Sequence, residues 1–225
     1  MDTSSSSGTT AVVIGGSIAG SLAAAALADY ATQVVVVDRD VLPAAPVLRK
    51  GAPHAHQVHA LTVGGRLAME ELLPGLTKNA VADGVPLIDT AKDIRYATKC
   101  GWLPRFDSEM RSLMASRPYI ETLLRRHASA LDNVTFRDST EVTGWLLEDD
   151  RVVGVETRGP GDQVGQIRAG LVIDTMGRGS ATPDWLEVHG YPRPEQTTIN
   201  ARWGYATVYL KPPAGWQPEF RSMFI

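Results

Sequence analysis

The stretch VVIGGSIAG, residues 12–20, decides the fold of this chain. A short β-branched run leads into glycines and then into an alanine-rich segment, which predicts a buried strand, a tight turn and a helix over 18–29. QVVVVD, residues 33–38, is a second apolar run without alternation, as in a parallel strand that is buried on both faces. Together these segments predict a βαβ unit of about 30 residues.

The turn of this unit has the form of a nucleotide-phosphate site. A helix N-terminus carries unpaired N–H groups and partial positive charge, so a pyrophosphate can lie there. The dinucleotide fingerprint is Gly-x-Gly-x-x-Gly, and here Ser17 stands in place of the second glycine, between Gly15 and Gly20. Ser17 is small and its hydroxyl could donate to a phosphate oxygen, while Gly16 adds conformational freedom. An ordinary βαβ turn is the alternative.

Asp38, at the end of the second strand, favours the cofactor interpretation. A carboxylate at this place can accept hydrogen bonds from ribose hydroxyls. Arg39 beside it could meet a 2′-phosphate, stack on adenine or simply be solvated. An NAD dehydrogenase would continue with more βα units, but this chain has a long loop, LRKGAPHAHQVHAL (48–61), and later antiparallel strands. This departure favours FAD.

Composition narrows the class of protein. The chain has 225 residues and a net charge of -3, which argues against nucleic acid as a partner. The only cysteine, Cys100, excludes an internal disulfide and fits a reducing compartment. The start lacks the features of a signal peptide, and the apolar segment 18–29 is too short to span a bilayer. We therefore expect a cytoplasmic protein without a membrane partner.

Three histidines in the 48–61 loop, His54, His56 and His59, raise the question of a metal site. Carboxylate or cysteine ligands in a fixed spacing are absent nearby, so we expect polar or cofactor contacts there and no metal.

Hydrophobic periodicity and the helix-breaking Pro and Gly residues predict further helices and strands. Ser116 can cap a clear amphipathic helix, and Pro74-Gly75 would stop an earlier one. The predicted helices are 64–73 and 116–131, and the predicted strands are 85–90, two within 93–106 around a turn at Cys100-Gly101, 134–139, 141–148, 151–158, 166–175 and 201–210.

Five segments then carry a resemblance by their order and spacing: GGSIAG, VVVVDRD, RKGAPHAHQVHAL, SRPYIETLLRR and LVIDTMGRGSATPDWLEVHGY. Over nearly all of residues 11–210 the chain resembles FAD-dependent monooxygenases of the p-hydroxybenzoate hydroxylase type, and within them the bacterial branch that includes the polyether epoxidases. The resemblance implies an α/β fold: a Rossmann-type, GR2-like FAD-binding domain with an antiparallel β-meander and the start of a β-sheet substrate domain.

The expected domains are a disordered tail (1–10), an FAD-binding domain (11–180) with a hairpin insertion near 85–110, and the beginning of a substrate-binding domain (181–225). The chain stops on the apolar run RSMFI, which predicts a truncated chain or a subunit completed by a complementary C-terminal chain. In the enzymes that it resembles, a later Gly-Asp motif and much of the substrate pocket lie beyond this point.

The resemblance also implies a site. The glycine turn would hold the FAD pyrophosphate and Asp38 the ribose, while Arg117 would reach the flavin side, the strand at Val142 the adenine, and Gly177 belongs to a second cofactor motif. The candidate cofactor-binding residues are Gly15, Gly16, Ser17, Ile18, Ala19, Gly20, Asp38, Arg39, Arg49, Lys50, His56, Arg117, Val142 and Gly177.

Two departures from the family pattern stand out. Relatives often carry an Arg followed by His where this chain has His56 and Gln57, so either FAD would bind more weakly or Arg49 or Lys50 would pair with a phosphate instead. Many relatives have an Asp-Gly pair where Met176 precedes Gly177, which leaves either NAD(P)H or a separate flavin reductase as the electron source.

The implied function is that of an FAD-dependent monooxygenase of secondary metabolism, an epoxidase or hydroxylase. It would insert one oxygen atom from O2 into an alkene or aromatic small molecule. Because flavin carries the chemistry, no catalytic side chain is named. The alternatives are a non-catalytic FAD-binding fragment or subunit that needs a partner chain, and a flavin-dependent reductase or halogenase on the same scaffold. The halogenase signature Trp-x-Trp-x-Ile-Pro does not occur in the sequence.

Overall fold

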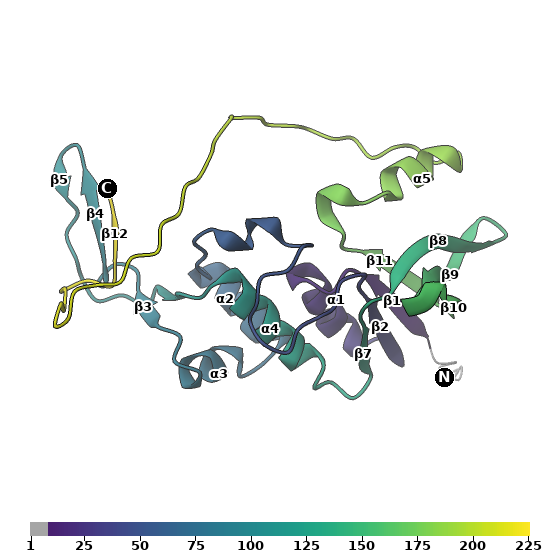
Figure 1. Cartoon of the computed structure of the whole chain (residues 1–225), viewed down its shortest axis with the longest axis horizontal. Helices are drawn as coiled ribbons and strands as arrows, with labels where there is room; N and C mark the ends of the chain where they lie inside the picture. The colour runs from purple at the N-terminus through teal and green to yellow at the C-terminus, as the bar shows by residue number, and fades with distance from the viewer. Residues whose placement is uncertain (1–8) are drawn as a thin grey trace, which may run out of the picture.

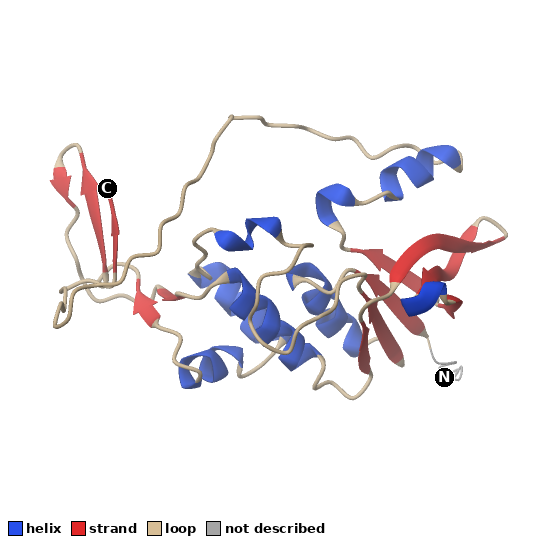
Figure 2. Ribbon diagram, in the orientation of Figure 1, coloured by secondary structure: helices blue, strands red, loops and turns tan. Residues whose placement is uncertain are grey.

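A parallel sheet lies between a layer of helices and an antiparallel meander in the computed structural model, which describes residues 9–225 (Figures 1 and 2). Its strand order is β11-β1-β2-β7, and every neighbouring pair is parallel. Four of the five residues in each of the two central strands are buried, because layers cover both faces of the sheet. The Rossmann-type α/β fold is confirmed. The strands are β1 (Thr10–Ile14), β2 (Gln33–Val37), β7 (Val134–Arg137) and β11 (Leu171–Asp174).

Alternate residues of the central strands divide between two cores. Val13 and Val36 face helix α1 (Ile18–Ala28), whereas Val12 and Val35 face the antiparallel meander. The period of two in a strand produces this division. Helix α1 is itself covered on its far side, where Ala25 packs against helix α4 (Arg117–Ala128). Small alanine side chains therefore allow α1 to lie closely between the sheet and a second helix.

The meander consists of β8 (Glu141–Glu148), β9 (Arg151–Arg158) and β10 (Val164–Arg168), in the order β10-β9-β8. The predicted single strand 166–175 is wrong, because the chain changes sheets within it. The Ala169 N–H donates to Val153 of β9, and the next N–H, of Gly170, donates to Thr10 of β1. From there the chain continues as β11 in the parallel sheet.

The helices lie near their predicted bounds, with two additions. The Ser116 side chain accepts the Tyr119 N–H at 3.4 Å, which confirms this N-cap. Glu70 accepts the N–H groups of Gly75 and Thr77 and so starts a short helix that propensity did not indicate. The helices are α2 (Val63–Leu72), α3 (Leu76–Ala82), α4 (Arg117–Ala128) and α5 (Thr182–Val188), with 3-10 turns Pro53–His56, Pro160–Asp162 and Gly177–Gly179; α3 and α5 were not predicted. None of these helices has the length and apolar character that crossing a membrane requires.

The predicted hairpin insertion and the C-terminal segment meet at the far end of the structure (Figure 1). After α5 the chain runs as a long loop past the helices, and its last strand pairs in parallel with β4. The strands here are β3 (Leu87–Asp89), β4 (Ile94–Thr98), β5 (Gly101–Trp102), β6 (Arg111–Leu113) and β12 (Ser222–Phe224).

Two predictions at the ends of the chain need correction. The strand predicted at 201–210 is wrong: the segment is extended but no neighbouring strand pairs with it, so its alternating side chains lie exposed. The predicted tail 1–10 is too long, because Thr10 already belongs to β1, and residues 1–8 lie outside the described part of the chain.

Candidate functional site

A pocket of about 170 Å³ lies at the carboxyl ends of β1 and β2. This edge is where open α/β sheets place their ligands. The glycine turn, the end of β2, the long loop and the start of β8 all contribute to it. The lining residues are Ile14, Gly15, Ser17, Val37, Asp38, Arg39, Asp40, Arg49, Gly51, Thr140, Glu141, Val142, Thr175, Met176 and Gly179.

The glycine turn is shaped by contacts that leave no room for a side chain. Gly15 has φ of +100°, which favours glycine. A Cβ on Gly20 would lie 1.7 Å from the Gly15 carbonyl oxygen, so α1 can approach the turn only with glycine there. In the described chain no side chain caps the N-terminus of α1. The first N–H groups of a helix have no acceptor within the helix, so they are free to bind a ligand. This cradle of N–H groups fits a diphosphate.

Asp38 closes the other side of the turn. Its carboxylate is 7% exposed; Oδ2 accepts the Gly16 N–H at 2.6 Å, and Oδ1 accepts the Asp40 N–H at 2.8 Å. The acid at the end of β2 is therefore tied directly to the turn at the end of β1, and it still borders the pocket.

Glu121, on α4, joins three segments of the site and was missed by the sequence analysis. Its Oε1 accepts the Ser17 hydroxyl at 2.8 Å and Arg117 Nε at 2.7 Å, and its Oε2 accepts Arg49 Nε at 3.0 Å. The residue is only 4% exposed. Burial opposes its charge, but the hydrogen bonds from Arg117, Ser17 and Arg49 outweigh burial and lower its pKa. Glu121 is thus a carboxylate at neutral pH.

The hydroxyl of Ser17 is already in use. It donates to Glu121 and accepts from Arg117 Nη2 at 3.1 Å. The idea that this hydroxyl donates to a phosphate disagrees with the geometry, because its one proton is directed to a carboxylate. The backbone N–H of the N-terminal turn remains for an anion.

Arg49 lies among three acids. Nη1 donates to Asp40 at 3.0 Å and is 3.6 Å from Asp38 Oδ2, while Nε is bound to Glu121. Burial opposes its charge, but Glu121 first and then Asp38 and Asp40 raise the pKa of Arg49 further. It keeps a permanent charge beside the glycine turn.

Some of the remaining predicted residues line the pocket, and others lie outside it. Arg39 is exposed at the rim, and Val142 lines the pocket from β8. Lys50 and His56 are exposed and are not among the lining residues. Gly177, with φ of +66°, is also outside, although its neighbour Met176 lines the pocket. Ile18 and Ala19 form the first turn of α1 and present its N-terminus.

Thr175 is a second residue that sequence reasoning missed. Its hydroxyl donates to the Ile14 carbonyl at 2.7 Å and lies 3.0 Å from that of Gly15, so it holds the glycine turn from β11. Nothing in the sequence placed it next to the turn, whereas Glu121 could have been found as the residue one helical turn after Arg117.

His54 and His59 lie close together, with ring centroids 6.0 Å apart. Burial and then the nearby charge of Arg117 lower the pKa of His54. Over residues 9–225 the structure gathers no set of three side chains able to hold a metal.

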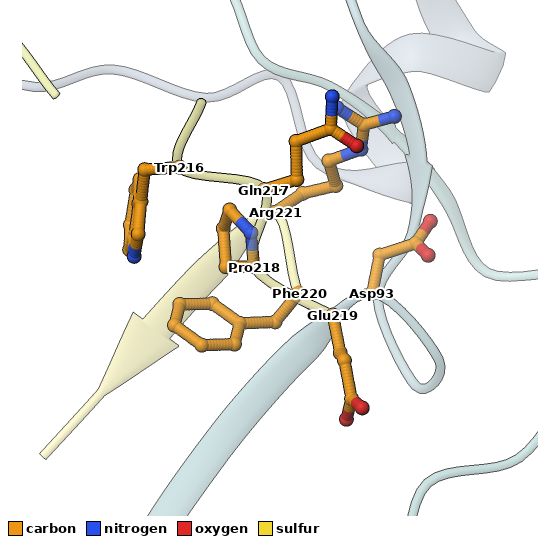
Figure 3. Close-up of a pocket in the computed structure, with 7 residues that line it drawn as sticks. All are labelled: Asp93, Trp216, Gln217, Pro218, Glu219, Phe220 and Arg221. Atoms are coloured by element: carbon orange, nitrogen blue, oxygen red, sulfur yellow. The ribbon is translucent and has the colours of Figure 1, made fainter. Parts of the chain in front are cut away.

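A larger cavity, of about 570 Å³, adjoins the segment that leads into β12 (Figure 3). All its lining residues except Asp93 come from the segment 216–221, and they include Trp216, Phe220 and Arg221. None of the candidate cofactor-binding residues lines it.

Comparisons with known proteins agree with this geometry. Residues 8–220 match the family described as FAD binding domain. Protein Rv3254 of Mycobacterium tuberculosis is 36% identical over 215 residues, which are 91% of this chain and 45% of that protein. The chain therefore spans less than half the length of this relative.

Two solved structures share the fold. A myxobacterial chondrochloren halogenase, an FAD-dependent enzyme, is 23% identical, with 76% of this chain and 38% of that chain covered and a TM-score of 0.57. The p-nitrophenol 4-monooxygenase of Pseudomonas putida is 22% identical, with 74% and 41% covered and a TM-score of 0.52. Since the family match extends over most of the sequence, this chain belongs to the FAD binding domain family.

Proposed function

We propose that this chain binds FAD and forms the cofactor-binding part of a flavin-dependent monooxygenase. The observation that carries the proposal is the pocket at the carboxyl ends of β1 and β2, which brings the glycine turn, the α1 N-terminus and Asp38 together. Family membership gives the cofactor, and the geometry offers a place for its adenosine diphosphate end.

The size of the pocket favours one part of FAD over the whole molecule. Pockets that enclose a drug-sized molecule measure roughly 300–1,000 Å³, whereas this one measures about 170 Å³. It suits the adenosine end, with the ribose at Asp38, adenine along the strand of Val142, and the diphosphate at the α1 N-terminus. Arg117 then lies toward the flavin side. Lys50, His56 and Gly177 stay candidates for parts of FAD outside the pocket.

Flavin supplies the redox chemistry with O2, and the protein binds and orients it. In this proposal the product is an alkene or aromatic small molecule that has gained one oxygen atom, by epoxidation or hydroxylation, in secondary metabolism in the cytoplasm. Electrons come from NAD(P)H or a flavin reductase. The monooxygenase among the structural neighbours supports this class of reaction. The halogenase supports the alternative of a flavin-dependent halogenase on the same scaffold.

A second candidate is an FAD-binding subunit that acts only with a complementary C-terminal chain. The segment between α5 and β12 favours it, because large apolar side chains there lie in solvent. They include Ile199, Trp203, Tyr205, Val208, Tyr209 and Leu210, each at least 75% exposed.

The test is the visible spectrum of the purified chain after incubation with FAD and removal of free cofactor. Retained flavin absorption supports the proposal, and a colourless chain that also fails to quench FAD fluorescence contradicts it. Consumption of O2 on reduction, with and without the complementary half of a relative, then separates the enzyme from the partner-dependent subunit.

A further inference from the structure

The cluster around Glu121 does more than connect helix α4 to the core. Its carboxylate lies between two arginines that come from different parts of the chain, Arg49 in the long loop and Arg117 at the start of α4. Each guanidinium group donates from Nε to this carboxylate, and this hydrogen bond fixes the plane of the group. A single buried acid therefore sets the orientation of two cations.

These cations flank the N-terminus of α1. Arg117 Nη2 is 3.1 Å from the hydroxyl of Ser17, which is the N-cap residue. Arg49 Nη1 is 3.6 Å from Asp38 Oδ2, and the same oxygen accepts the Gly16 N–H. Two guanidinium groups thus lie beside a turn whose own N–H groups already favour an anion.

Each arginine keeps donors to spare. Arg117 uses Nε and Nη2, and Arg49 uses Nε and Nη1. Within residues 9–225, Arg117 Nη1 and Arg49 Nη2 make no hydrogen bond. A guanidinium group has five N–H donors in a fixed planar fork, so fixing two of its nitrogens also fixes the direction of the third.

We infer that Glu121 is a positioning residue for the cofactor diphosphate. It fixes Arg49 and Arg117 so that their unused N–H groups meet the phosphates at the α1 N-terminus. It also accepts the hydrogen bond of the Ser17 hydroxyl, which directs that proton away from the phosphates. This inference rests on the proposed FAD binding and adds to it the residue that arranges the phosphate contacts.

The decisive variant is Glu121→Gln, which keeps the shape but has one acceptor oxygen. The amide nitrogen cannot accept, so either Arg49 or the Ser17–Arg117 pair loses its anchor. We expect the Kd for FAD and for ADP, measured by titration calorimetry, to rise about tenfold or more, as the loss of one well-placed charge-assisted contact implies. Adenosine, which lacks phosphates, should compete with the same affinity in both proteins.

The matched control is Glu70→Gln. The carboxylate of Glu70 also accepts hydrogen bonds through both oxygens, from the N–H groups of Gly75 and Thr77, but Glu70 lies outside the pocket. It should lower the melting temperature and leave the Kd for FAD unchanged. A purely structural role of Glu121 would give the same pattern in both variants.

The outcomes separate the two claims. If the unmodified chain binds neither FAD nor ADP, the proposed function fails. If it binds them and Glu121→Gln binds equally well or more tightly, or loses adenosine to the same extent, only the positioning role is wrong. If Glu121→Gln does not fold, Glu121→Asp decides, because it keeps the charge but is too short to hold both arginines. Unchanged FAD affinity in Glu121→Asp would overturn the inference.

Discussion

The hydroxyl of Ser17 donates to the carboxylate of Glu121 at 2.8 Å, across 104 positions of sequence. Ser17 stands where the dinucleotide fingerprint has its second glycine, and this bond gives the serine a function of its own. Together with the bond from Arg117 to the same hydroxyl, it fastens the N-terminus of α1 to α4, and the apolar contacts of Ala25 join the two helices further along.

Restoring the fingerprint glycine should therefore cost stability. Ser17→Gly loses the bond to a charged acceptor, which is worth about 1.5–3 kcal/mol when buried, and Ser17 is only half-buried, so we expect a loss of about 1–2 kcal/mol in the free energy of unfolding. Urea denaturation measures it.

Ser21→Ala is the matched control, one turn further along α1. The Ser21 hydroxyl is buried and has no partner within the described chain, so its removal should leave stability unchanged or raise it. Equal losses in the free energy of unfolding of both variants would show that the hydrogen bond to Glu121 does not stabilise the fold.

Gly20→Ala should damage both the fold and the site. The added Cβ would lie 1.7 Å from the Gly15 carbonyl oxygen, so α1 has to move away from the turn. We expect a loss of more than about 2 kcal/mol and at least tenfold weaker FAD binding. Thermal melting and fluorescence quenching measure the two effects.

Gly64→Ala gives the opposite expectation for the same substitution. Gly64 lies in α2 with nothing within 4 Å of an added Cβ, and alanine favours helix over glycine by up to about 1 kcal/mol. Stabilisation by Gly64→Ala and destabilisation by Gly20→Ala would separate close packing from helix propensity. Two equal effects would contradict the packing argument.

Asp38→Asn tests the ribose assignment. The amide keeps one acceptor oxygen, which the Gly16 N–H or the Asp40 N–H occupies, so it offers a poorer acceptor to ribose hydroxyls. We expect FAD, ADP and adenosine all to bind about tenfold more weakly. Loss of FAD and ADP binding with adenosine unaffected would place the ribose elsewhere.

Asp89 should make the stability of the protein depend on acid pH. It is fully buried, and Ser108 above all, with the N–H groups of Ala91 and Lys92, lowers its pKa to about 2. The unfolded value is about 3.9. Because the folded pKa is the lower one, its stabilisation is complete above the unfolded value and is lost as pH falls through the folded value.

Denaturation midpoints measured across that acid window provide the test. The slope with pH should be smaller in Asp89→Asn than in the unmodified chain, and Ser108→Ala, which removes the largest cause, should reduce it as well. A slope that neither substitution changes would assign the acid sensitivity to other carboxyl groups.

Local patterns predicted the centre of the fold well. The apolar runs of β1 and β2, the glycines and the alanine-rich α1 form a unit whose sequence signals are local. The Ser116 cap belongs to the same kind, since its partner is Tyr119, three residues away. Such signals survive without knowledge of the rest of the chain.

Partners far apart in sequence were not predictable. Residues 166–175 read as one strand, yet the crossing at Ala169 and Gly170 depends on acceptors in β9 and β1. Residues 201–210 alternate like a strand but have no strand beside them. Glu121 looks like an ordinary helix acid until the fold brings Ser17 and Arg49 to it.

The crossing between β10 and β11 also couples the local unfolding of the two sheets. Ala169 and Gly170 are consecutive residues, and their N–H groups are bound to different sheets, one to Val153 and the other to Thr10. Fraying at the start of β1 therefore loosens the attachment of the meander, and the reverse holds too. Amide hydrogen exchange in both sheets should consequently proceed as one cooperative unit, so that the meander beside the pocket opens no faster than the parallel sheet.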